Sequence, residues 1–227
     1  MIKWLEDAVF YEVYPQSFRD SNGDGIGDIP GITEKLEYIQ ELGCNALWIN
    51  PCFTSPFYDA GYDVEDYYSV APRYGTNEDL KKLFEAAHQR GMHVLLDLVP
   101  GHTAVTHPWF QESMKAEKNE YTDRYVWTDS LYKRMEDVKG IVSVLRGISP
   151  RPASCGVNCF STQPALNYGF ANITDAGWQQ PTDAPGPMAT REELKNIMRF
   201  WLTLGCDGFR VDMAGSLVKN DEDKKET

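Results

Sequence analysis

Apolar positions along this chain alternate between short continuous runs and longer runs at helical spacing. Short runs of apolar and aromatic residues are typical of buried β-strands, and apolar residues three or four positions apart are typical of amphipathic helices. The predicted strands are 8–14, 45–50, 93–98 and 207–213. The predicted helices are 32–42, a segment capped by Asn77 that ends at Gly91, and a segment that opens at Thr190 and ends at Leu204.

The order of strand, helix and strand predicts an α/β fold with a parallel sheet covered by helices. Polar side chains stand at the carboxyl ends of these strands, namely Asn50, Asp97, Arg210 and Asp212. Open parallel sheets and (β/α)8 barrels both bind their ligands at that edge. These four side chains are therefore candidates for a functional site.

The segment 103–187 breaks this alternation. It is rich in proline, glycine and polar residues, with scattered tryptophan. Because a structureless loop of that length is unusual inside a compact domain, the segment predicts a small inserted domain after the third strand. The predicted organisation is a barrel part at 1–102, the inserted domain at 103–187 and a second barrel part at 188–227.

Charge and composition narrow the classes of partner. The 227 residues include 22 basic and 34 acidic ones, a formal net charge of −12, which argues against nucleic acid or an anionic membrane surface as the main partner. The first residues lack an apolar stretch long enough for a signal peptide, and no apolar run of about 18 residues is present. With an odd number of cysteines, five, these features predict a cytoplasmic protein with reduced thiols.

A glycine-rich acidic loop is the strongest local motif. Its predicted calcium ligands are Asp20, Asn22, Asp24, Ile26 through its carbonyl, and Asp28. The twelfth position is Gly31 instead of the glutamate of an EF-hand, so an EF-hand sensor is rejected and a structural Ca²⁺ site is favoured. The alternative is a turn stabilised by Asx hydrogen bonds without a metal.

Arg210 and Asp212 lie one pleat apart at the end of the last predicted strand. A cation beside a carboxylate lowers its pKa and keeps it anionic, as a nucleophile requires. Such a pair alone is more often a structural ion pair, and a single His102 after Asp97 is equally ambiguous alone. The order of these elements along the chain favours a shared site.

Several spaced motifs together resemble the α-amylase superfamily, glycoside hydrolase family 13. The matching segments are 20–28, 55–63, 97–102, 163–167 and 208–212. The chain is most similar to the oligo-1,6-glucosidase and α-glucosidase branch. The resemblance implies an α/β fold that is the first half of a (β/α)8 TIM barrel, strands 1 to 4, with the small inserted domain after strand 3.

The resemblance also implies roles for individual residues. Asp212 would be the nucleophile that forms a glycosyl-enzyme intermediate, Arg210 would hold it ionised, and Asp97 would be a structural carboxylate beside Arg210. The retaining mechanism needs a second carboxyl group about 5 Å away as acid and base. The family places that glutamate at the end of the fifth strand, beyond this sequence, so we expect this chain alone to be inactive and to self-associate or to need the remainder of the barrel.

Three further residues match sugar-binding positions of the family. His102 would bond to the sugar at the cleaved linkage, Tyr62 would stack beneath it, and Asp59 would recognise a non-reducing-end glucose. The chain departs from the family pattern at two of its motifs. Gly101 stands where family members usually have Asn, and Ala165 stands where they usually have Asp.

The resemblance therefore predicts a retaining glycoside hydrolase whose substrate is an α-glucan or oligosaccharide. Two alternatives stay open: a transglycosylase or a sucrose- or trehalose-active enzyme, and a non-catalytic barrel relative. A pure calcium-binding module would leave the other motifs unexplained.

Overall fold

The computed structural model describes residues 2–223, and the chain divides into two compact units. The first unit combines the residues up to Thr54 with Asp66–Leu98 and Ile197–Arg210. The second unit combines Ser55–Glu65, Val99–Asn196 and the residues from Val211 onward. The second unit thus includes residues on both sides of 103–187, and the predicted boundaries of the inserted domain stay a prediction.

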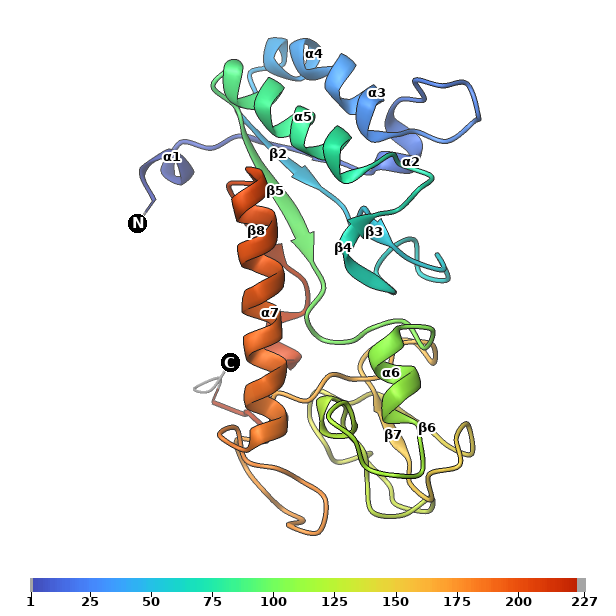
Figure 1. Cartoon of the computed structure of the whole chain (residues 1–227). Coiled ribbons are helices and arrows are strands. Elements are labelled where there is room, and N and C mark those ends of the chain that lie inside the picture. Colours follow the sequence, from blue (N-terminus) through green and yellow to red (C-terminus); the bar gives the residue numbers. More distant parts are fainter. Residues whose placement is uncertain (1, 224–227) are drawn as a thin grey trace. The chain divides into compact units, whose positions relative to one another are not determined.

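A four-stranded sheet forms the centre of the first unit (Figure 1). Its order is β1 (Phe10–Val13), β2 (Ala46–Ile49), β5 (His93–Leu98) and β8 (Gly208–Val211). The pairs β1–β2 and β2–β5 are parallel, with Ala46 opposite both Phe10 and His93. The predicted parallel sheet is confirmed for these strands. Strands that neighbour one another in chain order are what the first half of a (β/α)8 barrel requires.

Three helices accompany the first strands: α3 (Ile29–Glu34), α4 (Leu36–Glu41) and α5 (Asn77–Gln89). The single helix predicted at 32–42 is wrong in its bounds. It is two short helices that begin at Ile29 and are interrupted at Lys35, where φ is −105° and ψ is 7°. Asp28 caps the first of them by accepting a hydrogen bond from the Gly31 amide.

The predicted cap of α5 is also off by one position. Thr76 caps this helix in a capping box with Asp79, in which each side chain accepts from the other residue's backbone N–H. Asn77 is instead the first helical residue. Its side chain accepts from the Val70 amide and donates to the Tyr68 carbonyl, so it joins the helix to the strand before it.

The last helix, α7 (Pro185–Leu204), begins five residues before the predicted Thr190. Proline suits a first helical turn, because the amide it lacks would have no intrahelical partner there. The carboxyl-terminal part of α7 belongs to the first unit and carries Trp201, which is fully buried. Its ring stacks on Phe53 at 5.1 Å, and its Nε1 donates to the Tyr67 carbonyl over 2.7 Å.

Short elements complete the two units. Those of the first unit are α1 (Lys3–Glu6), α2 (Pro15–Phe18) and the antiparallel pair β3 (Phe53–Thr54) and β4 (Asp66–Val70). Those of the second are α6 (Pro108–Ser113), η1 (Thr122–Arg124), β6 (Ser143–Leu145), β7 (Cys155–Val157) and η2 (Ala214–Ser216). The second unit has its own buried cluster, which includes Phe110, Tyr125 and Trp127. Because the second unit has a hydrophobic core of its own, it forms a compact body.

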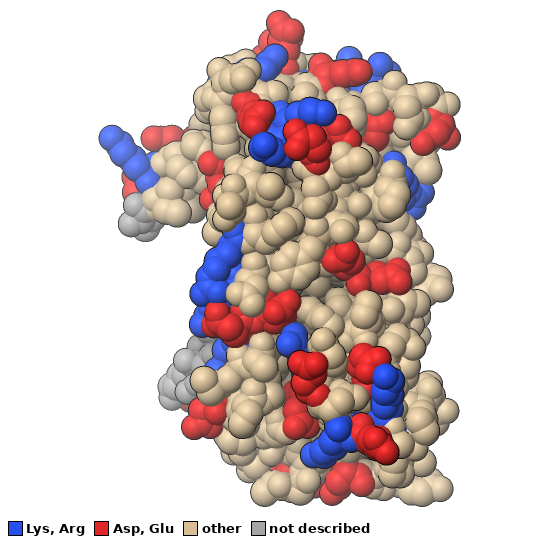
Figure 2. All heavy atoms as spheres, viewed as in Figure 1, with Lys and Arg blue, Asp and Glu red and all other residues tan. Residues whose placement is uncertain are grey.

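The distribution of surface charge and the state of the cysteines do not narrow the possible functions further. On the face seen in Figure 2, acidic and basic side chains are interspersed. All five cysteines are free thiols. Within the described residues, no helix combines the length and the apolar character needed to cross a membrane.

Candidate active site

Two of the predicted site residues meet within the first unit, at the ends of β5 and β8. Arg210 donates from Nη1 to both carboxylate oxygens of Asp97, over 3.0 and 3.3 Å. The Asp97 side chain is fully buried, whereas that of Arg210 is 36% exposed. Trp48 on β2 donates from Nε1 to Asp97 over 3.2 Å, and its ring lies 4.9 Å beneath the Arg210 guanidinium. The Asp97 carboxylate therefore accepts hydrogen bonds from both of these side chains.

In the second unit, Asp63 organises the loop that carries Asp59 and Tyr62. Asp63 is fully buried, and its carboxylate accepts from the Ser55 hydroxyl and from the amides of Tyr58 and Asp59, over 2.8 to 3.1 Å. Several residues of the loop have left-handed φ values, Phe57, Ala60 and Gly61. A buried carboxylate that collects three N–H and O–H donors can hold such a strained backbone in one conformation.

His102 joins that loop to the rest of the second unit. It is buried, its Nε2 lies 3.0 Å from the Tyr62 carbonyl oxygen, and its Nδ1 lies 3.0 Å from Oδ1 of Asn158. Burial lowers the pKa of His102. Its hydrogen bonds to Asn158 and Tyr62 and the charges of Asp212 and Asp59 act in the opposite direction and raise the pKa, but burial has the larger effect. Both ring nitrogens face oxygen acceptors, so the charged form satisfies both contacts and the neutral form only one.

Asn158 is a site residue that sequence reasoning missed. Its Nδ2 donates to the Gly140 carbonyl over 3.3 Å and to the Ser216 hydroxyl over 3.1 Å. Since a carbonyl can only accept, these bonds turn Oδ1 toward His102. A Cβ atom at Gly101 would lie closer than 3.0 Å to that Oδ1, so Asn158 occupies the space into which a side chain at 101 would extend. The lack of a side chain at Gly101, where the family usually has Asn, thus leaves room for the Asn158 amide.

Asp59 and Asp212 complete a group of charges around His102. Asp59 accepts a hydrogen bond of 2.6 Å from Nε2 of the buried Gln163. Burial raises the pKa of Asp59, the bond from Gln163 lowers it, and the charges of Asp63 and Asp212 raise it further. The charge of Asp212 thus acts on both Asp59 and His102. The structure therefore brings Asp59, His102 and Asp212 into electrostatic reach of one another, with Tyr62 bonded to His102.

Asp212 itself directly follows β8, two residues after Arg210. The next residue, Met213, has a left-handed φ of 45° and precedes η2. Only glycine, asparagine and aspartate adopt this conformation readily, so the chain turns sharply at a strained position right behind the carboxylate. The catalytic and sugar-binding roles of these residues stay predictions.

The predicted calcium loop forms a set of Asx turns. Asp20 accepts from the amides of Asn22, Gly23 and Gly25, and backbone hydrogen bonds from Gly25 and Gly23 lower its pKa. Asp28 is occupied as the cap of α3. Among residues 2–223, no group of three or more His, Cys, Asp or Glu side chains is arranged to hold a metal ion. The carboxylates of this loop are used by its own backbone, and calcium binding stays a prediction.

Comparison with known proteins fixes the family. Residues 12–227 match the family model described as alpha amylase, catalytic domain. The chain belongs to the α-amylase family. This membership, together with the similarity of the chain to solved structures, confirms the predicted fold, the amino-terminal half of a (β/α)8 barrel.

Proteins that are similar to this chain differ in their named activities. An oligo-1,6-glucosidase of Bacillus sp. (strain F5) is 38% identical over 96% of this chain and 40% of that protein. A trehalose synthase/amylase of Mycolicibacterium smegmatis is 42% identical over 96% of this chain and 35% of that protein. The sucrose complex of an isomaltulose synthase mutant from Erwinia rhapontici is 35% identical, with a TM-score of 0.78, over 94% of this chain and 36% of that one. The chain thus spans between 35% and 40% of the length of these relatives.

Proposed function

We propose that the protein is a retaining glycoside hydrolase that acts on the α-glucosidic bonds of α-glucans or oligosaccharides. The observation that carries this proposal is the group formed by Asp59, His102 and Asp212 in a chain of the α-amylase family. In this proposal Asp212 is the nucleophilic carboxylate, one of the two carboxyl groups that a retaining mechanism needs, and Asp59 and His102 lie where they can contact the sugar.

In this proposal the described residues supply the nucleophile and the sugar contacts. Asp212 attacks the anomeric carbon, and the bond to the leaving oxygen breaks as that oxygen takes a proton from an acid outside the 227 residues. Water then attacks the anomeric carbon of the covalent intermediate and gives a proton to the same residue, now acting as a base, and the Asp212 carboxylate is released. His102 and Asp59 hold the sugar hydroxyls, and the ion pair of Arg210 with Asp97 keeps the guanidinium at the end of β8.

A second candidate is transfer of the glucosyl group to another sugar instead of water. It is favoured by the names of two relatives, a trehalose synthase/amylase and an isomaltulose synthase. Both reactions share the first step, so they differ only in which acceptor reaches the intermediate. Products from maltose, trehalose and sucrose, separated by chromatography, distinguish hydrolysis from transfer.

We also propose that the loop from Asp20 to Asp28 binds a structural Ca²⁺. Its support is the alternation of oxygen-bearing side chains along a tight turn, which calcium ligation requires. Oδ2 of Asp20 and the Oδ1 atoms of Asn22 and Asp24 each accept one backbone N–H and keep a second lone pair for a cation. Isothermal titration with CaCl2, alongside an Asp20→Ala variant, tests this proposal by the loss of binding.

The main proposal is tested with 4-nitrophenyl α-glucoside and maltooligosaccharides. The 227-residue chain and a longer chain that continues through the rest of the barrel are assayed side by side, each with and without Asp212→Asn. The proposal expects turnover in the longer form and a loss of at least 1,000-fold, on the order expected for a catalytic group, in its Asp212→Asn variant. Absence of turnover in every form would favour a non-catalytic barrel relative.

A further inference from the structure

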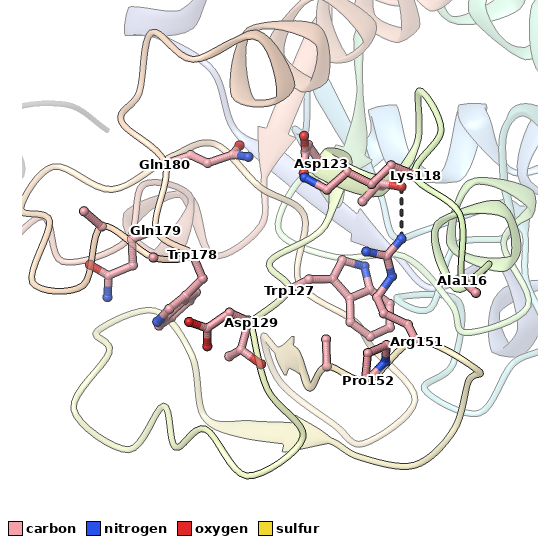
Figure 3. A pocket seen from close by; sticks show the side chains of 15 residues that line it. Ala116, Lys118, Asp123, Trp127, Asp129, Arg151, Pro152, Trp178, Gln179 and Gln180 are labelled. Atoms are coloured by element: carbon pink, nitrogen blue, oxygen red, sulfur yellow. Dashed lines mark hydrogen bonds between the residues drawn. The ribbon is translucent and has the colours of Figure 1, made fainter.

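A pocket lies within the second unit, lined by residues that the catalytic proposal does not use (Figure 3). Its volume is about 490 Å³, within the range of roughly 300–1,000 Å³ typical of small-molecule sites. Arg151 and Trp127 form one wall, and Trp178 with Asp129 faces them. Asp123, Lys118 and Gln180 also line it. None of these side chains belongs to the candidate active site.

Arg151 is the most constrained group of the pocket. It is 9% exposed, its Nε donates to the Ser113 carbonyl, and its Nη2 donates to the Lys115 carbonyl and the Thr122 hydroxyl, over 3.0 to 3.2 Å. Its guanidinium lies 5.3 Å above the Trp127 ring. Its Nη1 has no hydrogen-bond partner among residues 2–223, nor does any of their carboxylates form an ion pair with Arg151. A buried donor held in place by other bonds, with one amino group left over, is suited to a ligand.

The remaining lining selects the chemistry of that ligand. The formal charges of the residues that line the pocket sum to zero, because Lys118 and Arg151 are positive and Asp123 and Asp129 are negative. The charge of Asp123 acts on Arg151, although the two form no ion pair. A neutral hydroxyl can accept from the guanidinium while another donates to the carboxylate, whereas an anion would meet both acidic groups. The half-buried ring of Trp178 offers an apolar face beside these polar groups.

We infer that this pocket binds a neutral sugar of one or two hexose units, at a position apart from the candidate active site. Adjacent sugar hydroxyls would bridge Nη1 of Arg151 and the carboxylate of Asp123, and the C–H face of the ring would pack on Trp178. The volume accommodates a disaccharide. The choice of an α-glucan as the probe rests on the proposed function, whereas the pocket and its chemistry do not.

The test uses the longer chain that continues through the rest of the barrel, the full-length protein, with Asp212→Asn so that maltose is not hydrolysed. This variant is titrated with maltose by isothermal calorimetry and saturation-transfer NMR. Trp178→Ala removes the ring. Asp123→Asn keeps the shape of the side chain and removes its charge, so it serves if the first variant folds poorly. Tyr132→Ala is the matched control, because Tyr132 is an aromatic side chain of the same unit, 89% exposed and outside the pocket.

The inference expects a class of maltose binding that both pocket variants weaken at least tenfold and that Tyr132→Ala leaves unchanged. With Asp212 restored, Trp178→Ala should hydrolyse 4-nitrophenyl α-glucoside within twofold of the parent. Unchanged maltose binding in both pocket variants overturns the inference, and so does saturable binding of inorganic phosphate that maltose does not displace. Pocket-dependent maltose binding in a protein without any glycosidase activity would sink the proposed function and leave this inference standing.

Discussion

The contact between Gly101 and Asn158 gives the sharpest prediction about the site. Gly101→Ala places a Cβ atom closer than 3.0 Å to Oδ1 and 3.2 Å from Cγ of Asn158. Asn158 is 1% exposed and tied to Gly140, Ser216 and His102, so it cannot turn away freely. Overpacking costs about 1–3 kcal/mol, and each hydrogen bond lost as Asn158 moves costs about 1 kcal/mol. We expect Gly101→Ala to lower the free energy of unfolding by about 3 kcal/mol.

A double-mutant cycle isolates this contact. Asn158→Ala alone leaves the buried Nδ1 of His102 and two part-buried acceptors without this partner, and we expect a loss of about 2 kcal/mol. In the double variant Gly101→Ala/Asn158→Ala, the new methyl group enters space that the amide has vacated. The free energy of unfolding of the double variant should therefore fall by about as much as that of Asn158→Ala alone. This loss is about 2–3 kcal/mol smaller than the sum of the losses of the two single variants.

The assay is equilibrium urea unfolding of the full-length protein and its variants, followed by tryptophan fluorescence. Gly215→Ala is the matched control, because nothing lies within 4 Å of a Cβ atom there, and it should change the free energy of unfolding by less than about 0.5 kcal/mol. Strict additivity of the two single variants, or a neutral Gly101→Ala, would show that a side chain at position 101 and the Asn158 amide do not compete for the same space.

Three further predictions concern the core of the first unit, a buried lysine and the acidic loop. Arg210→Ala leaves the fully buried carboxylate of Asp97 without its cation, and since Arg210 is itself half-buried, we expect a loss at the low end of about 3–5 kcal/mol in urea unfolding. Burial lowers the pKa of Lys219 to about 7, so the unfolded state binds more protons above that pH, and the free energy of unfolding should rise as pH increases from about 7 to 9. Lys219→Met should flatten that rise in the same urea titrations, and an equal slope in both proteins would contradict it. Removing calcium with EDTA should lower the melting temperature of the parent but not of Asp20→Ala, and equal shifts would argue for a loop without a metal.

The strands were the most predictable part of the fold. The segment 93–98 is a strand over its whole predicted length, because a mostly apolar segment of six residues is too short for a helix and suits a sheet buried on both faces. The helix predicted at 32–42 failed at Lys35, where apolar spacing continues although the backbone leaves the helical region. Spacing reports which face is buried and does not report such a local break.

The candidate site was predictable where a motif carries the residue type and not where a distant side chain completes it. Asp97 and Arg210 are 113 positions apart, and the family resemblance was what placed them together in advance. Asn158 lies 56 positions from His102 and matches no motif, so no local pattern could indicate it. The unusual Gly101 was the available signal, since a missing side chain in a buried site calls for another group to fill its space.

The proposed mechanism requires that Asp212 forms a covalent bond with the sugar. The most direct measurement is mass spectrometry of peptides from the full-length protein after reaction with 5-fluoro-α-glucosyl fluoride, a substrate whose glycosyl-enzyme intermediate breaks down slowly. We expect one fluoroglucosyl group, carried by the peptide that contains Asp212, and no label in Asp212→Asn. A label on any other carboxylate, or rapid turnover with inversion at the anomeric carbon and no label, would contradict it.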